Sequence, residues 1–153
     1  MCAALVLSAL LAPAPGRDPA EQAALAALEK VGFEEGAQMR QHHVVVLEAN
    51  LEPPGKQWPP LTAKGLARMA ELRHLGSLQL PPRRTTDEHL SALPDLPELR
   101  TLILQNTRVT DAGLKNLTRY KKLSSVYLGR SRVTDHGLKT LAGLPALIIR
   151  RLH

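Results

Sequence analysis

The amino-acid sequence predicts an α/β fold in which short units of strand, turn, helix and turn stack along one direction. Three observations predict it. The phrase TRVTDAGLKNL at 107–117 returns as SRVTDHGLKTL at 131–141, which defines a 24-residue period. Within a unit, apolar residues first alternate and then recur at spacing three, as in a strand followed by a helix. Aromatic residues make up only 3% of a chain that is 44% hydrophobic, so aliphatic side chains must supply the core.

The N-terminal segment MCAALVLSALLAPAPG, at positions 1–16, contains an uncharged apolar run that is too short to cross a bilayer as a helix. The run ends in small residues with the pattern of a signal-peptide cleavage site. We therefore expect an exported protein that is periplasmic, on the cell surface or secreted. The alternatives are an uncleaved N-terminus in a cytoplasmic protein or a misplaced start codon. The one cysteine, Cys2, excludes an internal disulfide framework.

Residues 17–60 are expected to cap the repeats, beginning with a helix. Asp18 suits the N-cap, Pro19 suits the first helical position, and Glu21 suits a box-like N-terminus. Gly32 suits the end of the helix.

A strand and a loop are expected after this helix. The β-branched run HHVVVLEAN at 42–50 predicts the strand. The segment LEPPGKQWPPL at 51–61, with four prolines and one glycine, predicts the loop.

Residues 61–153 align into about four units with this 24-residue period, of which the last strand is incomplete. Each column of the alignment holds similar residues. The helix columns are Leu66, Leu90, Leu114 and Leu138, then Met69, Leu93, Leu117 and Leu141; the strand column is Leu78, Leu102, Val126 and Arg150. One unit alone buries too little apolar surface to offset the entropy of ordering its backbone, so neighbouring units must stack.

The phrase TDxGL predicts how each helix begins. Thr110 or Asp111 suits the helix N-cap, and an aspartate there also lies favourably in the helix dipole. Gly113 and Gly137 follow inside the first turn, where we expect a close approach between neighbouring units.

The segment LRTLILQNTRVTDAGLKNLTRYKKL resembles the leucine-rich repeat pattern L-x-x-L-x-L-x-x-N/T-x-V/L. Its VTDxGLxxL ending resembles a 24-residue class that is common in bacterial repeat proteins. The resemblance is weaker in the first two units, where TAKGL and TTDEHL replace VTDxGL. Ubiquitin-ligase substrate receptors carry a similar phrase, but they favour cysteine where this chain has Thr107 and Ser131.

The resemblance implies a leucine-rich repeat solenoid: a short right-handed arc with parallel strands on the concave face and helices or helical turns on the convex face. It also implies a non-catalytic protein-interaction module that binds another protein through the concave face. The candidate binding residues on that face are Gln79, Thr101, Ile103, Gln105, Ser125, Tyr127, Ile149 and Arg151. Ile103 and Tyr127 are expected to form a small apolar patch. The alternative is an ordinary surface without a ligand.

Arginines form a further column. Arg84, Arg108 and Arg132 recur at the same period, and each stands three positions before an aspartate. In stacked units they lie about 4.8 Å apart, the spacing of neighbouring strands. We expect each arginine to pair with its own or a neighbouring aspartate; the alternative is an anion-binding edge.

Positive charge is concentrated in the C-terminal part of the chain. Residues 99–153 carry 11 basic and 2 acidic side chains, whereas the whole chain has a net charge of +6. The alternative function is therefore binding of a polyanion: acidic polysaccharide, nucleic acid or an anionic surface, with Lys121, Lys122 and Arg130 among the contributors. No nucleic-acid motif accompanies these residues, so sequence-specific recognition is not expected.

The sequence carries no catalytic or metal-binding motif. Its six histidines lack the spacing of metal ligands, and there is no phosphate loop or nucleophile elbow. We expect no enzyme activity, no cofactor, no metal and no transmembrane span.

At the C-terminus, Arg150 occupies a core column, which suggests a cap, an edge that docks another chain, or a truncated gene.

Overall fold

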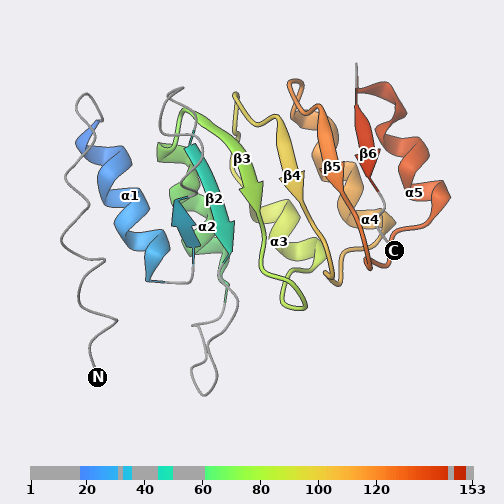
Figure 1. The fold of residues 1–153 in the computed structure, drawn as a ribbon, viewed down its shortest axis with the longest axis horizontal. Coiled ribbons are helices and arrows are strands. Elements are labelled where there is room, and N and C mark those ends of the chain that lie inside the picture. Colours follow the sequence, from blue (N-terminus) through green and yellow to red (C-terminus); the bar gives the residue numbers. More distant parts are fainter. Residues whose placement is uncertain (1–17, 31–32, 36–44, 50–60, 145–146, 151–153) are drawn as a thin grey trace.

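The computed structural model describes residues 18–30, 33–35, 45–49, 61–144 and 147–150. It has two layers, a six-stranded sheet in front and helices behind it, with α1 at the end next to β1 and β2 (Figure 1). The strand order is β1-β2-β3-β4-β5-β6, so neighbours in the sheet are neighbours in sequence. The mixed α/β class predicted from the sequence is confirmed.

The elements of the described part have the following bounds. The strands are β1 (Phe33–Glu35), β2 (Val45–Ala49), β3 (Leu75–Gln79), β4 (Thr101–Ile103), β5 (Ser125–Tyr127) and β6 (Ile148–Arg150). The α-helices are α1 (Pro19–Glu29), α2 (Ala63–Ala67), α3 (Asp87–Ala92), α4 (Asp111–Leu114) and α5 (Asp135–Thr140). Short 3-10 helices continue three of them: η2 (Arg68–Glu71), η3 (Lys115–Arg119) and η4 (Leu141–Gly143).

Strands β2 to β6 run parallel, whereas β1 pairs antiparallel with β2. Strand β1 was not predicted from the sequence, because so short a strand cannot display a period. In the central strands Ser77 pairs with Thr101, and Thr101 with Ser125, so partners lie one repeat period apart in the chain. For β3, β4 and β5 the sequence period is therefore the register of the sheet.

The last strand breaks this period. Val126 pairs with Ile149, one position before the residue that the period would give, and Tyr127 pairs with Arg150. The prediction that Arg150 continues the core column is therefore wrong. A shift of one residue turns every side chain of a strand to the other face. Here it places Ile149 against the core and leaves Arg150 exposed, which avoids burying a guanidinium.

Helix α1 begins as predicted. Asp18 is its N-cap and accepts a 3.0 Å hydrogen bond from the Ala20 N–H, and Pro19 takes the first position. The side chain of Glu21 does not lie at the exposed cap; it is buried on the same face as Ala24 and Leu28. The predicted end at Gly32 lies outside the described residues.

The core lies between the helices and the sheet. Leu102 and Val126 are fully buried, whereas the residues on either side of each in its strand are half-buried, so β4 and β5 turn one face inward. The helix columns meet them from the other side: Leu66, Leu90 and Leu114 are also fully buried.

Two predicted segments, the signal peptide and most of the Pro-rich loop, lie outside the described residues. Within the described part, no helix is long and apolar enough to span a membrane.

Candidate functional site

The repeated TDxG phrase joins neighbouring units of the structure. The Asp87 carboxylate accepts hydrogen bonds from the N–H and hydroxyl of Thr110, at 2.8 and 2.6 Å. Asp111 accepts the same pair from Thr134, at 2.7 and 2.5 Å. Each threonine is in turn the N-cap of its own helix and accepts from the N–H two positions later. Each aspartate therefore fixes the start of the next helix.

The glycine of the phrase leaves room for this aspartate. A Cβ atom on Gly113 would lie 2.4 Å from Asp87 Oδ1, and one on Gly137 would lie 2.2 Å from Asp111 Oδ1. The expected close approach at Gly113 and Gly137 is confirmed. Among the described residues, a Cβ on Gly65, in the same column, would meet only Thr62 Oγ1, at 3.4 Å.

The first junction uses a different pair of residues for the same task. Ala63 and His89 stand where the other junctions have aspartate and glycine. The N–H of Thr86 donates to His89 Nδ1 at 3.0 Å, and the Thr86 hydroxyl lies 2.8 Å from the same atom. His89 Nε2 lies 3.0 Å from the Leu61 carbonyl oxygen of the preceding unit. Because a carbonyl only accepts and an N–H only donates, the neutral imidazole carries its proton on Nε2.

The hydrogen bonds of Asp111 favour its ionised form. The Thr134 hydroxyl, the Thr134 N–H and the charge of His136 together lower the pKa of Asp111. Asp87 and Asp111 are therefore held by threonines rather than by the arginines that were expected to pair with them. Arg108 and Arg132 form no ion pair with a described residue.

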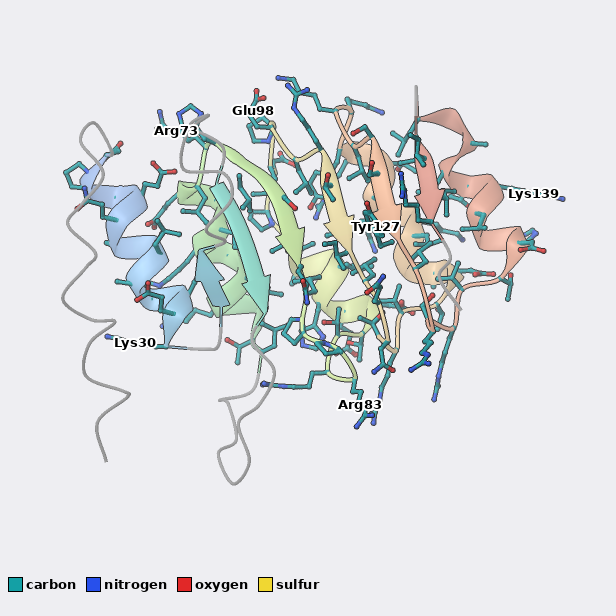
Figure 2. The ribbon with its side chains drawn as sticks, viewed as in Figure 1. Lys30, Arg73, Arg83, Glu98, Tyr127 and Lys139 are labelled. Atoms are coloured by element: carbon teal, nitrogen blue, oxygen red, sulfur yellow. The ribbon has the colours of Figure 1, made fainter. Side chains whose placement is uncertain are left out.

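The predicted arginine column lies at one edge of the molecule. Arg84, Arg108 and Arg132 belong to the loops that follow the C-terminal ends of β3, β4 and β5, and Arg83 and Arg130 belong to the same loops. Figure 2 shows Arg83 at this edge, opposite the edge that carries Arg73 and Glu98. Arg83 was not predicted as a member of the group, and Arg130 was predicted only as a contributor to the net charge.

The other basic side chains of the C-terminal part are dispersed. Lys122 forms an ion pair with Glu98 at the opposite edge, which lowers the pKa of Glu98. Arg119 donates to the Leu93 carbonyl and lies 5.0 Å above the ring of Tyr120. Lys139 projects from α5 (Figure 2). The structure therefore does not gather the basic side chains of the C-terminal part on one surface.

The face of the sheet that points away from the helices carries most of the predicted binding residues. We call it the open face: Ser77, Gln79, Thr101, Ile103, Ser125, Tyr127, Ile148 and Arg150. The first six are half-buried. Gln105 follows β4 just beyond the strand, and Arg151 lies outside the described residues.

The register of β6 corrects the composition of the open face. Ile149 was predicted there, but it packs against the core, and Ile148 takes the place beside Ser125. Ile148 is 55% exposed and is the one large apolar side chain of the described residues in the exposed class. The guanidinium of Arg150 lies 5.8 Å from the ring centroid of Tyr127, within the range of a cation–π contact. Tyr127 projects from β5 in Figure 2.

The described residues include no group of three or more histidine, cysteine, aspartate or glutamate side chains that could hold a metal ion.

The predicted patch of Ile103 and Tyr127 is brought together, since the two residues pair directly across β4 and β5.

No family model matches the chain, and no curated protein is significantly similar to it. The proposals below therefore depend on the geometry of the chain itself.

Proposed function

We propose that this chain is a non-catalytic protein-interaction module, built as a short leucine-rich repeat solenoid and exported by its N-terminal segment. Support for the solenoid comes from the periodic pairing of β3, β4 and β5 and from the Asp–Thr hydrogen bonds that recur between units. Each unit then presents the same positions on the same face, as in other stacked-repeat proteins.

The open face is the proposed binding surface, and the observation that carries this is its composition. Ile103, Tyr127 and Ile148 lie on adjacent parallel strands and place apolar surface among hydroxyl and amide side chains. Apolar and aromatic anchors surrounded by polar groups are typical of protein-binding surfaces.

The chemistry of the face also indicates the kind of partner. Among the described side chains of the open face Arg150 is the one cation, and none is acidic. Arg150 already lies beside Tyr127, where it can bind a carboxylate while the ring contacts an apolar group. The expected partner is therefore a protein segment with an apolar side chain next to an acidic one.

Affinity capture with matched variants tests the proposal. The bait is the full chain as wild type, as Tyr127→Asp and as Lys139→Asp, the last of which places a new acidic side chain on the exposed side of α5. Circular dichroism first establishes that all three are folded. We expect a protein bound by wild type and by Lys139→Asp to be lost from Tyr127→Asp.

Two results would overturn this choice of surface. One is a partner that binds Tyr127→Asp as tightly as wild type. The other is a partner that Lys139→Asp loses to the same extent, since this would place the contact on the helical side.

A further inference from the structure

The structure assigns a second binding site to the loops at the C-terminal ends of the strands: a linear sulfated polysaccharide binds along the arginine edge, formed by Arg83, Arg84, Arg108, Arg130 and Arg132. This site is separate from the open face. It does not depend on the function proposed for that face.

The charge of this edge is the first argument. The three segments 80–86, 104–110 and 128–134 contain these five arginines and no acidic residue. Arg83, Arg108, Arg130 and Arg132 are exposed. The nearest acidic residues along the chain begin the helices, and the carboxylates of Asp87 and Asp111 are bound to Thr110 and Thr134. Those two carboxylates already have their hydrogen-bond partners.

The loops hold the arginines in a row. Backbone hydrogen bonds join one loop to the next: the Arg83 N–H to the Asn106 carbonyl at 2.6 Å, the Arg108 N–H to the Thr85 carbonyl at 2.9 Å, and the Arg132 N–H to the Val109 carbonyl at 3.1 Å. Buried Thr85 and Thr107 each donate a hydroxyl hydrogen bond back into their own loop. The guanidinium groups therefore extend from a fixed backbone, with successive loops about one strand spacing, ~4.8 Å, apart.

The backbone conformation does not favour arginine at two positions of the arginine edge, 83 and 130. Arg83, Asn106 and Arg130 have φ angles of 60°, 55° and 54°, which is the left-handed region. Glycine and asparagine adopt this region more easily than arginine does. Asn106 is the residue that folding alone would favour there, so the choice of arginine at 83 and 130 indicates a task for the side chain.

The chemistry of the row selects the ligand. Guanidinium binds sulfate through paired hydrogen bonds and is less strongly hydrated than ammonium, so arginine suits recognition of sulfate better than lysine. Binding of single-stranded nucleic acid usually adds aromatic side chains on which bases stack. The segments 80–86, 104–110 and 128–134 contain no aromatic residue. A linear polymer with regularly spaced sulfates and no bases fits this row best.

Heparin chromatography of the full chain tests the site. Wild type is compared with Arg108→Glu/Arg132→Glu and with Lys115→Glu/Lys139→Glu, which changes the net charge equally but alters residues of the helical layer. The milder Arg108→Gln/Arg132→Gln covers the case in which charge reversal prevents folding. We expect wild type and the lysine variant to be retained at about 150 mM NaCl and both arginine variants to elute in the wash.

Several outcomes would overturn the proposal. Wild type could pass through heparin unretained, or the lysine variant could lose retention as completely as the arginine variants. If the protein elutes from a sulfopropyl column at the same salt concentration as from heparin, its binding is non-specific charge attraction and not recognition of the polysaccharide. A single-stranded oligonucleotide that displaces the protein more effectively than dextran sulfate would assign the edge to nucleic acid instead.

Discussion

Replacing glycine by alanine at two equivalent positions should change stability in opposite directions. Gly65 and Gly113 occupy the same column and lie in the first turn of α2 and α4. At Gly65 the new methyl group meets Thr62 Oγ1 at an ordinary distance of 3.4 Å and no other atom of the described part of the chain within 4 Å. Alanine is favoured over glycine inside a helix, so Gly65→Ala should stabilise the protein by about 0.5–1 kcal/mol.

At Gly113 the same methyl group meets the preceding unit. It would lie 2.4 Å from Asp87 Oδ1 and 3.1 Å from Leu90 Cδ1, and real Cβ contacts essentially never fall below 3.0 Å. The carboxylate must move, which lengthens its hydrogen bonds to Thr110. Overpacking of this kind costs about 1–3 kcal/mol. After the gain in helix propensity, we expect Gly113→Ala to destabilise the protein by about 1–2 kcal/mol.

Thermal unfolding followed by circular dichroism measures both effects. For a chain of this size each kcal/mol corresponds to roughly 2–4 °C in Tm. Gly65→Ala should raise Tm and Gly113→Ala should lower it. Adding Asp87→Ala to Gly113→Ala should cost less than the two single changes predict, because the methyl group and the carboxylate compete for one space. Equal shifts at Gly65 and Gly113, or strict additivity with Asp87→Ala, would refute the reasoning.

Three further predictions concern single side chains. Hydrogen bonds lower the pKa of Asp111 in the folded state, so its contribution to stability is present above the unfolded pKa and is lost as pH falls through the folded pKa. The Tm difference between wild type and Asp111→Asn should therefore shrink below about pH 4. A Tm difference that stays constant in acid would contradict this. One carboxylate oxygen of buried Glu21 has no hydrogen-bond partner among the described residues. Glu21→Leu should therefore raise the free energy of unfolding by about 1 kcal/mol, whereas Glu29→Leu, on the exposed face of α1, should not; a lower urea-denaturation midpoint for Glu21→Leu would be the opposing result. The buried Tyr120 hydroxyl donates a hydrogen bond to the Pro94 carbonyl at 2.9 Å, so Tyr120→Phe should destabilise the protein by about 1 kcal/mol in urea denaturation. An unchanged urea-denaturation midpoint would show that this hydrogen bond contributes nothing to stability.

Much of the fold is predictable from the sequence because the period and the register are the same quantity. Leu102 and Val126 are one repeat period apart in sequence and are partners in the sheet. Once two such columns are recognised, the inward and outward faces of β4 and β5 follow from alternation. The caps at Thr110 and Thr134 follow from the same alignment.

The last strand shows where this argument fails. Extending the period to residue 150 assumes that each unit has the same length, and the alignment itself contains no check on that assumption. A charged residue falling in a core column was the signal, because burying an unpaired arginine costs more than shifting a short strand by one residue. The same shift explains why Ile149 was expected on the open face and lies in the core.

The first junction escaped prediction for a different reason. Aligned singly, Ala63 and His89 look like two departures from the TDxG phrase. Only the structure shows that His89 contacts Thr86 and the Leu61 carbonyl of the preceding unit, and so bonds the capping threonine as the aspartate does at the later junctions. A search for departures that occur together, at the aspartate position of one unit and the glycine position of the next, would have found this exchange in the sequence.

The two proposed binding surfaces were predictable only in part. Ile103 and Tyr127 were placed correctly as neighbours, because both lie in regular strands. Arg83 and Arg130 were not added to the arginine column, because they stand just before its periodic positions. Loop residues at different offsets come together through hydrogen bonds between loops, which the spacing of a sequence does not reveal.

Site-specific photocrosslinking tests the central claim most directly: that the open face, rather than the helical layer, binds a protein partner. A photoreactive amino acid replaces Tyr127 in one form of the full chain and Lys139 in another, and each is irradiated with the protein that wild type captures. A crosslinked adduct with the Tyr127 form and none with the Lys139 form is the predicted result. An adduct formed only from position 139 would contradict it.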